Sequence, residues 1–188
     1  MSEVLLNNFI CIIIQFLTLF TCTKILLKKP KIIPSLKEIF SVLIMASFFI
    51  MLYKIDYSSI NTLLSFIVMV VGVLVTYREK LSVSIILVGL YMITTFAADF
   101  INGMILLTFL TIDQIRGVFF IPSNILVSAI TIAIMEIPIF KKMAIRIIDS
   151  VTTGEKKDLF DITFVVIFIF SMSLIFHIIS AAYLTDGS

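Results

Sequence analysis

The sequence alternates between long runs of apolar residues and short segments that carry most of its charges. A helix needs about 20 consecutive apolar residues to cross the hydrocarbon core of a bilayer. Most runs reach this length, and the second reaches it only with its flanking residues. The pattern predicts a single-domain, all-α, polytopic membrane helix bundle over residues 1–188, with about six transmembrane helices. The predicted spans lie near 4–27, 37–54, 58–77, 81–100, 118–140 and 160–184.

The composition agrees with this pattern. Hydrophobic residues make up 61% of the chain and charged residues 14%, with a mean hydropathy of +1.21. A soluble domain carries about 45–50% apolar and about 25% charged residues. Too few polar side chains remain to cover a globule in water, so we expect a multi-pass protein of the cell membrane, surrounded by lipid and without a nucleic-acid partner.

The basic residues predict how the bundle is oriented, because Lys and Arg in short loops stay on the cytoplasmic side. Twelve of the 14 basic residues lie after the first, third or fifth run. Only Lys54 and Arg116 fall on the other side. The N-terminus is therefore expected outside. The twelve are Lys24, Lys28, Lys29, Lys31, Lys37, Arg78, Lys80, Lys141, Lys142, Arg146, Lys156 and Lys157.

The segment after the fifth run contains candidates for coupling between the two faces of the membrane. Pro138 is expected to kink or end the fifth helix. Glu136 is expected to reach the inner interface and pair with Lys141 or Lys142, or else to be a coupling residue that changes partner between two states. Apolar residues then recur at helical spacing and predict a short amphipathic helix in the inner interface. They are Met143, Ile147, Ile148 and Val151.

Residues that could carry enzyme chemistry are sparse. Cys11 and Cys22 are separated by about 16 Å of helical rise, beyond the roughly 7 Å limit for a disulfide, so both are expected as free thiols. His177 is the only histidine. It is interpreted either as a core histidine bonded to a neighbouring carbonyl or hydroxyl, or as a coupling residue. A cysteine paired with His177 as nucleophile and base would lack a third residue to orient the imidazole. We expect neither an enzyme nor a cofactor or metal site.

Asp99 interrupts the apolar stretch TTFAADFINGMILLTF, residues 94–109. A carboxylate in mid-bilayer costs about 2.5 to 3.5 kcal/mol on insertion scales. Counting about 20 residues from Leu81 places the outer boundary near Phe100, and thus Asp99 at the outer rim. The apolar residues from Gly103 onward are then either a long tilted helix end or a surface that receives an apolar ligand. The candidate ligand-binding residues at this face are Lys54, Asp56, Tyr57, Asp99, Asn102, Asp113 and Arg116.

Several short segments give the chain a resemblance to a known family. They are NNF at 7–9, LYKIDYSSINTLLSFIVM at 52–69, YREK at 77–80 and FFIPSN at 119–124. With the span layout, they resemble the membrane sensor half of accessory gene regulator (AgrC-type) quorum-sensing receptor histidine kinases of Gram-positive bacteria. The resemblance implies a two-component receptor that binds a secreted cyclic autoinducing peptide outside, and forms a homodimer when full-length. The kinase domain that such a receptor uses is absent from this sequence.

Two other classes remain as alternatives. An AgrB-type membrane peptidase has a similar length, but needs a cysteine and a histidine close in sequence, whereas Cys11 and Cys22 lie far from His177. The substrate-binding subunit of an energy-coupling-factor vitamin transporter also has six helices in under 200 residues. Such subunits tend to have Gly- and Ala-rich helices and both termini inside, and neither property is expected here.

Overall fold

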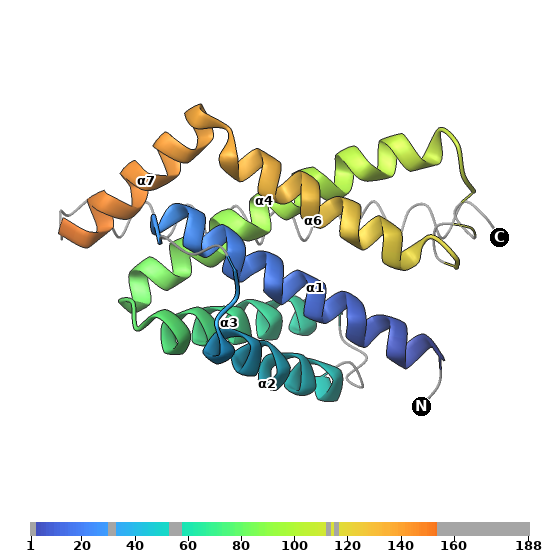
Figure 1. Ribbon diagram of the computed structural model, residues 1–188, viewed down its shortest axis with the longest axis horizontal. Coiled ribbons are helices and arrows are strands. Elements are labelled where there is room, and N and C mark those ends of the chain that lie inside the picture. Colours follow the sequence, from blue (N-terminus) through green and yellow to red (C-terminus); the bar gives the residue numbers. More distant parts are fainter. Residues whose placement is uncertain (1–2, 30–32, 53–57, 112–113, 115–116, 154–188) are drawn as a thin grey trace.

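The computed structural model describes residues 3–29, 33–52, 58–111, 114 and 117–153. The predicted sixth run, with His177, lies outside these residues. Within them the chain forms an all-helical bundle (Figure 1), in which five helices correspond to the first five predicted runs and the last to the amphipathic segment. The helices are α1 (Glu3–Leu26), α2 (Leu36–Leu52), α3 (Ser58–Tyr77), α4 (Leu81–Leu107), α6 (Phe120–Glu136) and α7 (Pro138–Thr153).

Helix α1 lies at the centre of the bundle. In Figure 1, α2 and α3 lie on one side of it, α6 lies on the other, and α4 crosses behind it from the α3 side to the α6 side. Helix α1 contacts every other described helix. Its sequence is apolar all round, as expected of a helix that is packed on several faces. Phe16, Leu19 and Phe20 are almost fully buried. The core of the molecule therefore follows α1, and the other helices are positioned by packing against it.

Two of the described helices are long and apolar enough to cross a membrane: Leu5–Leu26 of α1, and α4. The pair α6–α7 would be a third, bent span. Large apolar side chains are also exposed on the outer faces of α2 and α3, among them Phe40, Phe48, Val71 and Val75. Extended exposed apolar surface is unusual for a soluble monomer. These features fit a helical bundle that lies in a membrane.

The predicted fifth run is divided into two helices at Pro138, where the chain bends by 75°. Ile137, before the proline, has an extended ψ of 122°, because proline disfavours the helical conformation in its predecessor. Pro138 itself opens α7, where its missing N–H is not needed. The prediction that Pro138 kinks or ends this helix is confirmed, and the run 118–140 is not one straight helix.

Helix α7 packs against α4, α6 and α1 through its apolar face. Ala144, Ile148 and Val151 are buried, and Ile147 packs against the core. Met143 was predicted on this face but is 50% exposed. The amphipathic helix is thus as expected, but its buried face is rotated so that Ala144, rather than Met143, contacts the bundle.

Helix α4 continues to Leu107, seven residues beyond the boundary expected near Phe100. Gly103 does not end it, although glycine costs about 1 kcal/mol relative to alanine in a helix interior. Packing of α4 against α6 supports this region. The stretch from Gly103 to Leu107 is therefore part of an extended helix end.

Candidate functional site

The structure describes two of the seven predicted ligand-binding residues, Asp99 and Asn102. Both lie on α4, three residues apart and therefore on one face of the helix. Asp99 is exposed, whereas Asn102 is 4% exposed. The other five candidates lie outside the described residues; they are Lys54, Asp56, Tyr57, Asp113 and Arg116.

Asn102 joins α4 to α6. Its Nδ2 atom donates a hydrogen bond of 2.7 Å to Oγ of Ser123, near the start of α6. Its Oδ1 atom is buried and accepts no hydrogen bond from the described residues. An unpaired buried acceptor costs about 1–3 kcal/mol, so a donor that reached Oδ1 would be bound favourably. The site thus offers two acceptors, Asn102 Oδ1 and the Asp99 carboxylate.

Large apolar side chains are exposed near the end of α4. Phe100, Met104, Leu107 and Phe109 are all more than half exposed. We call this region, Asp99 to Phe109 at and just beyond the end of α4 together with the start of α6 at Phe120–Ser123, the Asn102 end of the bundle. Its chemistry is that of an apolar surface with hydrogen-bond acceptors, which suits a ligand that combines apolar side chains with N–H donors.

The opposite end of the bundle, which we call the charged end, contains a buried ion pair. Lys24 Nζ of α1 lies 2.6 Å from Glu38 Oε2 of α2, and both side chains are less than 8% exposed. The hydroxyl of Tyr77, at the end of α3, donates to Glu38 Oε1 at 2.7 Å. Lys24 Nζ also donates to the carbonyl oxygen of Ile33 at 2.9 Å. Three helices are therefore joined by hydrogen bonds that keep both buried charges paired.

Glu38 also closes the start of α2. The backbone N–H of Ser35 donates to Glu38 Oε2 at 2.6 Å, and the N–H of Glu38 lies 3.4 Å from Ser35 Oγ. This reciprocal arrangement is a capping box. In a sequence, a Ser followed three residues later by Glu indicates such a box. The sequence analysis counted Lys24 only as an orientation marker and did not single out Glu38 or Tyr77. The Ser35–Glu38 spacing was the signal that could have found Glu38.

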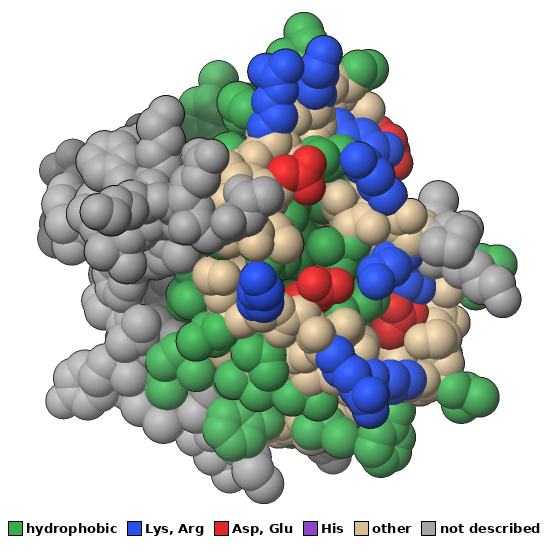
Figure 2. Space-filling view, turned by 90° about the vertical axis from the view of Figure 1, so that its left-hand side faces the viewer, with side chains coloured by type: hydrophobic (Ala, Val, Ile, Leu, Met, Phe, Trp, Pro, Cys, Tyr) green, Lys and Arg blue, Asp and Glu red, His purple; other side chains and the backbone are tan. Residues whose placement is uncertain are grey.

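The basic segments predicted on one side of the membrane come together at the charged end. Figure 2 shows Lys and Arg side chains gathered there around acidic ones. Lys29 Nζ lies 3.8 Å from Glu79 Oε1, and Lys80 Nζ donates to the carbonyl oxygen of Thr152 at 3.3 Å. The ends of α1, α3 and α7 are thus in contact. This is expected if the three basic segments lie on the same side of the bundle.

The coupling candidates Glu136 and Pro138 flank the bend between α6 and α7. Glu136 Oε2 pairs with Lys141 Nζ at 2.8 Å across the bend, so the predicted pairing of Glu136 with Lys141 or Lys142 is confirmed. Both side chains are partly exposed, and an exposed pair of this kind contributes little stability. The third coupling candidate, His177, lies outside the described residues.

Neither cysteine is placed for reactivity. Cys11 and Cys22 are both free and buried within α1, which confirms that they are not bridged to each other. Among the described residues, no group of three or more His, Cys, Asp or Glu side chains is arranged to hold a metal ion. What distinguishes the molecule chemically is therefore the contrast between its Asn102 end and its charged end.

Comparison of the chain with protein-family models, with curated proteins and with solved structures found no match.

Proposed function

We propose that the chain is the membrane sensor domain of a quorum-sensing receptor of the AgrC type. In this proposal the bundle crosses the membrane six times with its N-terminus outside, and the charged end lies at the cytoplasmic face. A cyclic peptide pheromone binds at the Asn102 end. The signal passes to a histidine kinase that is not present in this chain, in a full-length receptor that forms a homodimer in a Gram-positive cell membrane.

The observation that carries this proposal is the chemistry of the Asn102 end. Asn102 Oδ1 is a buried acceptor without a donor among the described residues, and the same end of α4 exposes large apolar side chains on its other faces. A small cyclic peptide can match both the acceptor and the apolar surface, because its backbone carries N–H donors and its side chains can be apolar. A closed ring also loses little conformational freedom on binding, which favours affinity.

Helices α6 and α7 give such a site a route to the opposite end. Ser123 near the start of α6 is bonded to Asn102, and α7 follows α6 directly after the bend at Pro138. Lys80 then connects the charged end of α4 to Thr152 of α7. A ligand that inserts beside Asn102 would shift α6 relative to α4, and the Glu136–Pro138 bend would transmit this shift to α7. Such a ligand acts by binding one packing arrangement better than another.

Synthetic cyclic peptides that carry a photoreactive apolar side chain test this proposal. The purified chain in lipid nanodiscs is expected to crosslink saturably, with the label mapping to residues 99–109 or 120–126. Asn102→Leu removes the acceptor and is expected to weaken binding roughly three- to ten-fold, the equivalent of one hydrogen bond.

Two controls make the result specific. The linear form of the same peptide is expected to bind more weakly than the ring. Asn124→Leu is the matched variant, because the amide of Asn124 bonds to the carbonyl oxygen of Phe120 in its own helix and to no other helix within the described residues. Failure of cyclic peptides of every ring size to crosslink saturably, or crosslinks that map to the charged end, would contradict the proposal.

A further inference from the structure

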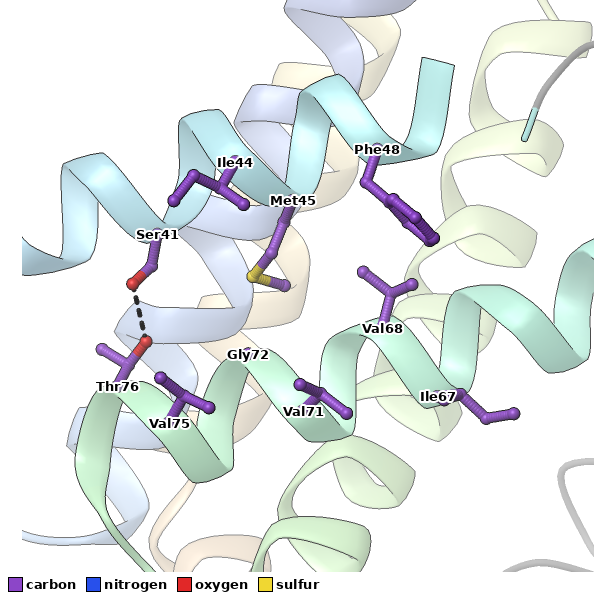
Figure 3. A pocket seen from close by; sticks show the side chains of 10 residues that line it. All are labelled: Ser41, Ile44, Met45, Phe48, Ile67, Val68, Val71, Gly72, Val75 and Thr76. Carbon is purple, nitrogen blue, oxygen red and sulfur yellow. Dashed lines mark hydrogen bonds between the residues drawn. The ribbon is translucent and has the colours of Figure 1, made fainter. Parts of the chain in front are cut away.

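A groove runs between α2 and α3 on the outside of the bundle (Figure 3). It has a volume of about 470 Å³, within the range of about 300–1,000 Å³ that is typical of small-molecule sites. Its walls are formed mainly by apolar side chains of the two helices, namely Ile44, Met45, Phe48, Val68, Val71 and Val75. The groove therefore offers a binding surface for an apolar chain.

Met45 of α2 packs directly against the α3 backbone at Gly72, which also lines the groove. Gly72 has no Cβ, and a Cβ at that position would overlap the sulfur atom of Met45 on α2. At one end of the groove, Thr76 Oγ1 donates to Ser41 Oγ at 2.9 Å (Figure 3), so these two hydroxyl groups are paired with each other. The groove consequently presents hydrocarbon along its length and polar atoms only at one end.

That end of the groove is also where positive charge lies. Lys37 precedes Ser41 by one turn of α2, and its Nζ donates to the carbonyl oxygens of Thr76 at 2.6 Å and Val75 at 3.4 Å. A lysine ammonium carries three donors, so one remains beyond these two carbonyl groups. Arg78 follows Thr76 by two residues and is exposed. An anionic group at this end of the groove would meet Lys37, and Arg78 is the first cation after Thr76 along the chain.

We propose that this groove binds an anionic phospholipid, with an acyl chain along the α2–α3 walls and the phosphate at Lys37 and Arg78. The apolar walls match the acyl chain, and the two cations match the negative charge of the headgroup. Basic residues next to the membrane surface attract anionic lipids in this way. A second copy of the chain fits less well, because a parallel copy would bring its own Lys37 and Arg78 toward the same cations. This lipid site is independent of peptide binding at the Asn102 end.

Native mass spectrometry of the chain, exchanged into detergent with added phosphatidylglycerol, measures the proposed binding. The parent chain is expected to retain one phosphatidylglycerol molecule in preference to phosphatidylcholine. Lys37→Gln is expected to reduce retention about five-fold, as the loss of one basic residue near an anionic headgroup predicts. Val71→Phe is expected to reduce retention of both lipids, because the ring fills the groove.

Matched variants control for general effects of charge and size. Lys142→Gln removes an exposed lysine of α7 that does not line the groove. Ile125→Phe enlarges a side chain of α6 that is 53% exposed, as Val71 is 52% exposed. Neither control is expected to change retention.

Three outcomes would overturn the lipid site. The first is that the parent chain retains phosphatidylglycerol and phosphatidylcholine equally. The second is that the groove variants and their controls lose the same amount of bound lipid. The third is that the chain forms a lipid-free dimer that Val71→Phe dissociates. Because both test positions lie on exposed faces, the variants are expected to keep the melting temperature of the parent chain, which is measured alongside. Failure of cyclic peptides to bind would leave these lipid results unchanged, so the two proposals can fail separately.

Discussion

Replacing Glu38 by alanine is expected to destabilise the bundle by about 3–5 kcal/mol, the cost of breaking a buried ion pair by removing one partner. The variant leaves the Lys24 ammonium buried with the carbonyl oxygen of Ile33 as its remaining acceptor. It also removes the shorter hydrogen bond of the Tyr77 hydroxyl, which keeps the carbonyl oxygen of Phe20 as an acceptor, and the acceptor of the Ser35 N–H. Helices α1, α2 and α3 would lose their shared contact at once.

Thermal unfolding in detergent measures this effect. The double variant Lys24→Met/Glu38→Gln removes both charges but keeps an acceptor for Ser35 and Tyr77. Its loss of stability is therefore expected to be smaller than the sum of the losses in Lys24→Met alone and Glu38→Gln alone. Lys141→Ala breaks the partly exposed pair with Glu136 and is the matched control, with an expected loss below about 1 kcal/mol. Similar melting temperatures for Glu38→Ala and Lys141→Ala would show that the buried pair does not hold these helices together.

Ala144→Asp is expected to release α7 from the bundle. Ala144 is fully buried where α7 packs on the other helices, and an unpaired charge in such a position costs several kcal/mol. Met143→Asp is the matched control, because the neighbouring residue is 50% exposed and points away from the core.

Hydrogen exchange of the α7 amides distinguishes these two variants. Ala144→Asp is expected to speed exchange throughout 138–153 by at least ten-fold, whereas Met143→Asp leaves it nearly unchanged. The contact of Lys80 with Thr152 would be lost only in the first variant. Equal exchange in both would mean that α7 does not dock through the face that contains Ala144.

The sequence predicted the helices well because their signals are local. Apolar runs and intervening charges placed α1 and α3 within a residue or two of their observed ends. Proline chemistry placed the bend at Pro138, and sequence proximity placed Glu136 beside Lys141. Each of these features depends on residues that are close together along the chain.

The features that the sequence analysis missed depend on contacts between helices. The pairing of Lys24 with Glu38 requires the end of α1 and the start of α2 to lie at the same depth and to face each other. The bond of Asn102 to Ser123 requires α4 to run alongside α6 beyond the boundary that an average span length predicts. The buried side of α7 is fixed by the surface on which it docks, so a rotation that exchanges Met143 for Ala144 cannot be read from periodicity alone.

Asn102 illustrates the same limit at the candidate site. Its position at the end of an apolar run indicated a polar residue near a membrane surface. Its burial, its bond to Ser123 and its unpaired Oδ1 atom depend on how α4 meets α6. The sequence could therefore nominate Asn102, but only the packing of the two helices gives it the chemistry that the receptor proposal uses.

The receptor proposal rests on one claim, that the Asn102 end faces outward and the charged end faces the cytoplasm. Labelling of single cysteines with a membrane-impermeant maleimide tests it most directly. Thr108→Cys lies at the Asn102 end and Lys142→Cys on α7, and both positions are exposed. The parent chain is the control, because Cys11 and Cys22 are buried. With the charged end in the cytoplasm, Thr108→Cys is expected to be labelled in intact cells and Lys142→Cys only after permeabilisation. Labelling of Lys142→Cys in intact cells, with Thr108→Cys protected until permeabilisation, would show the opposite orientation.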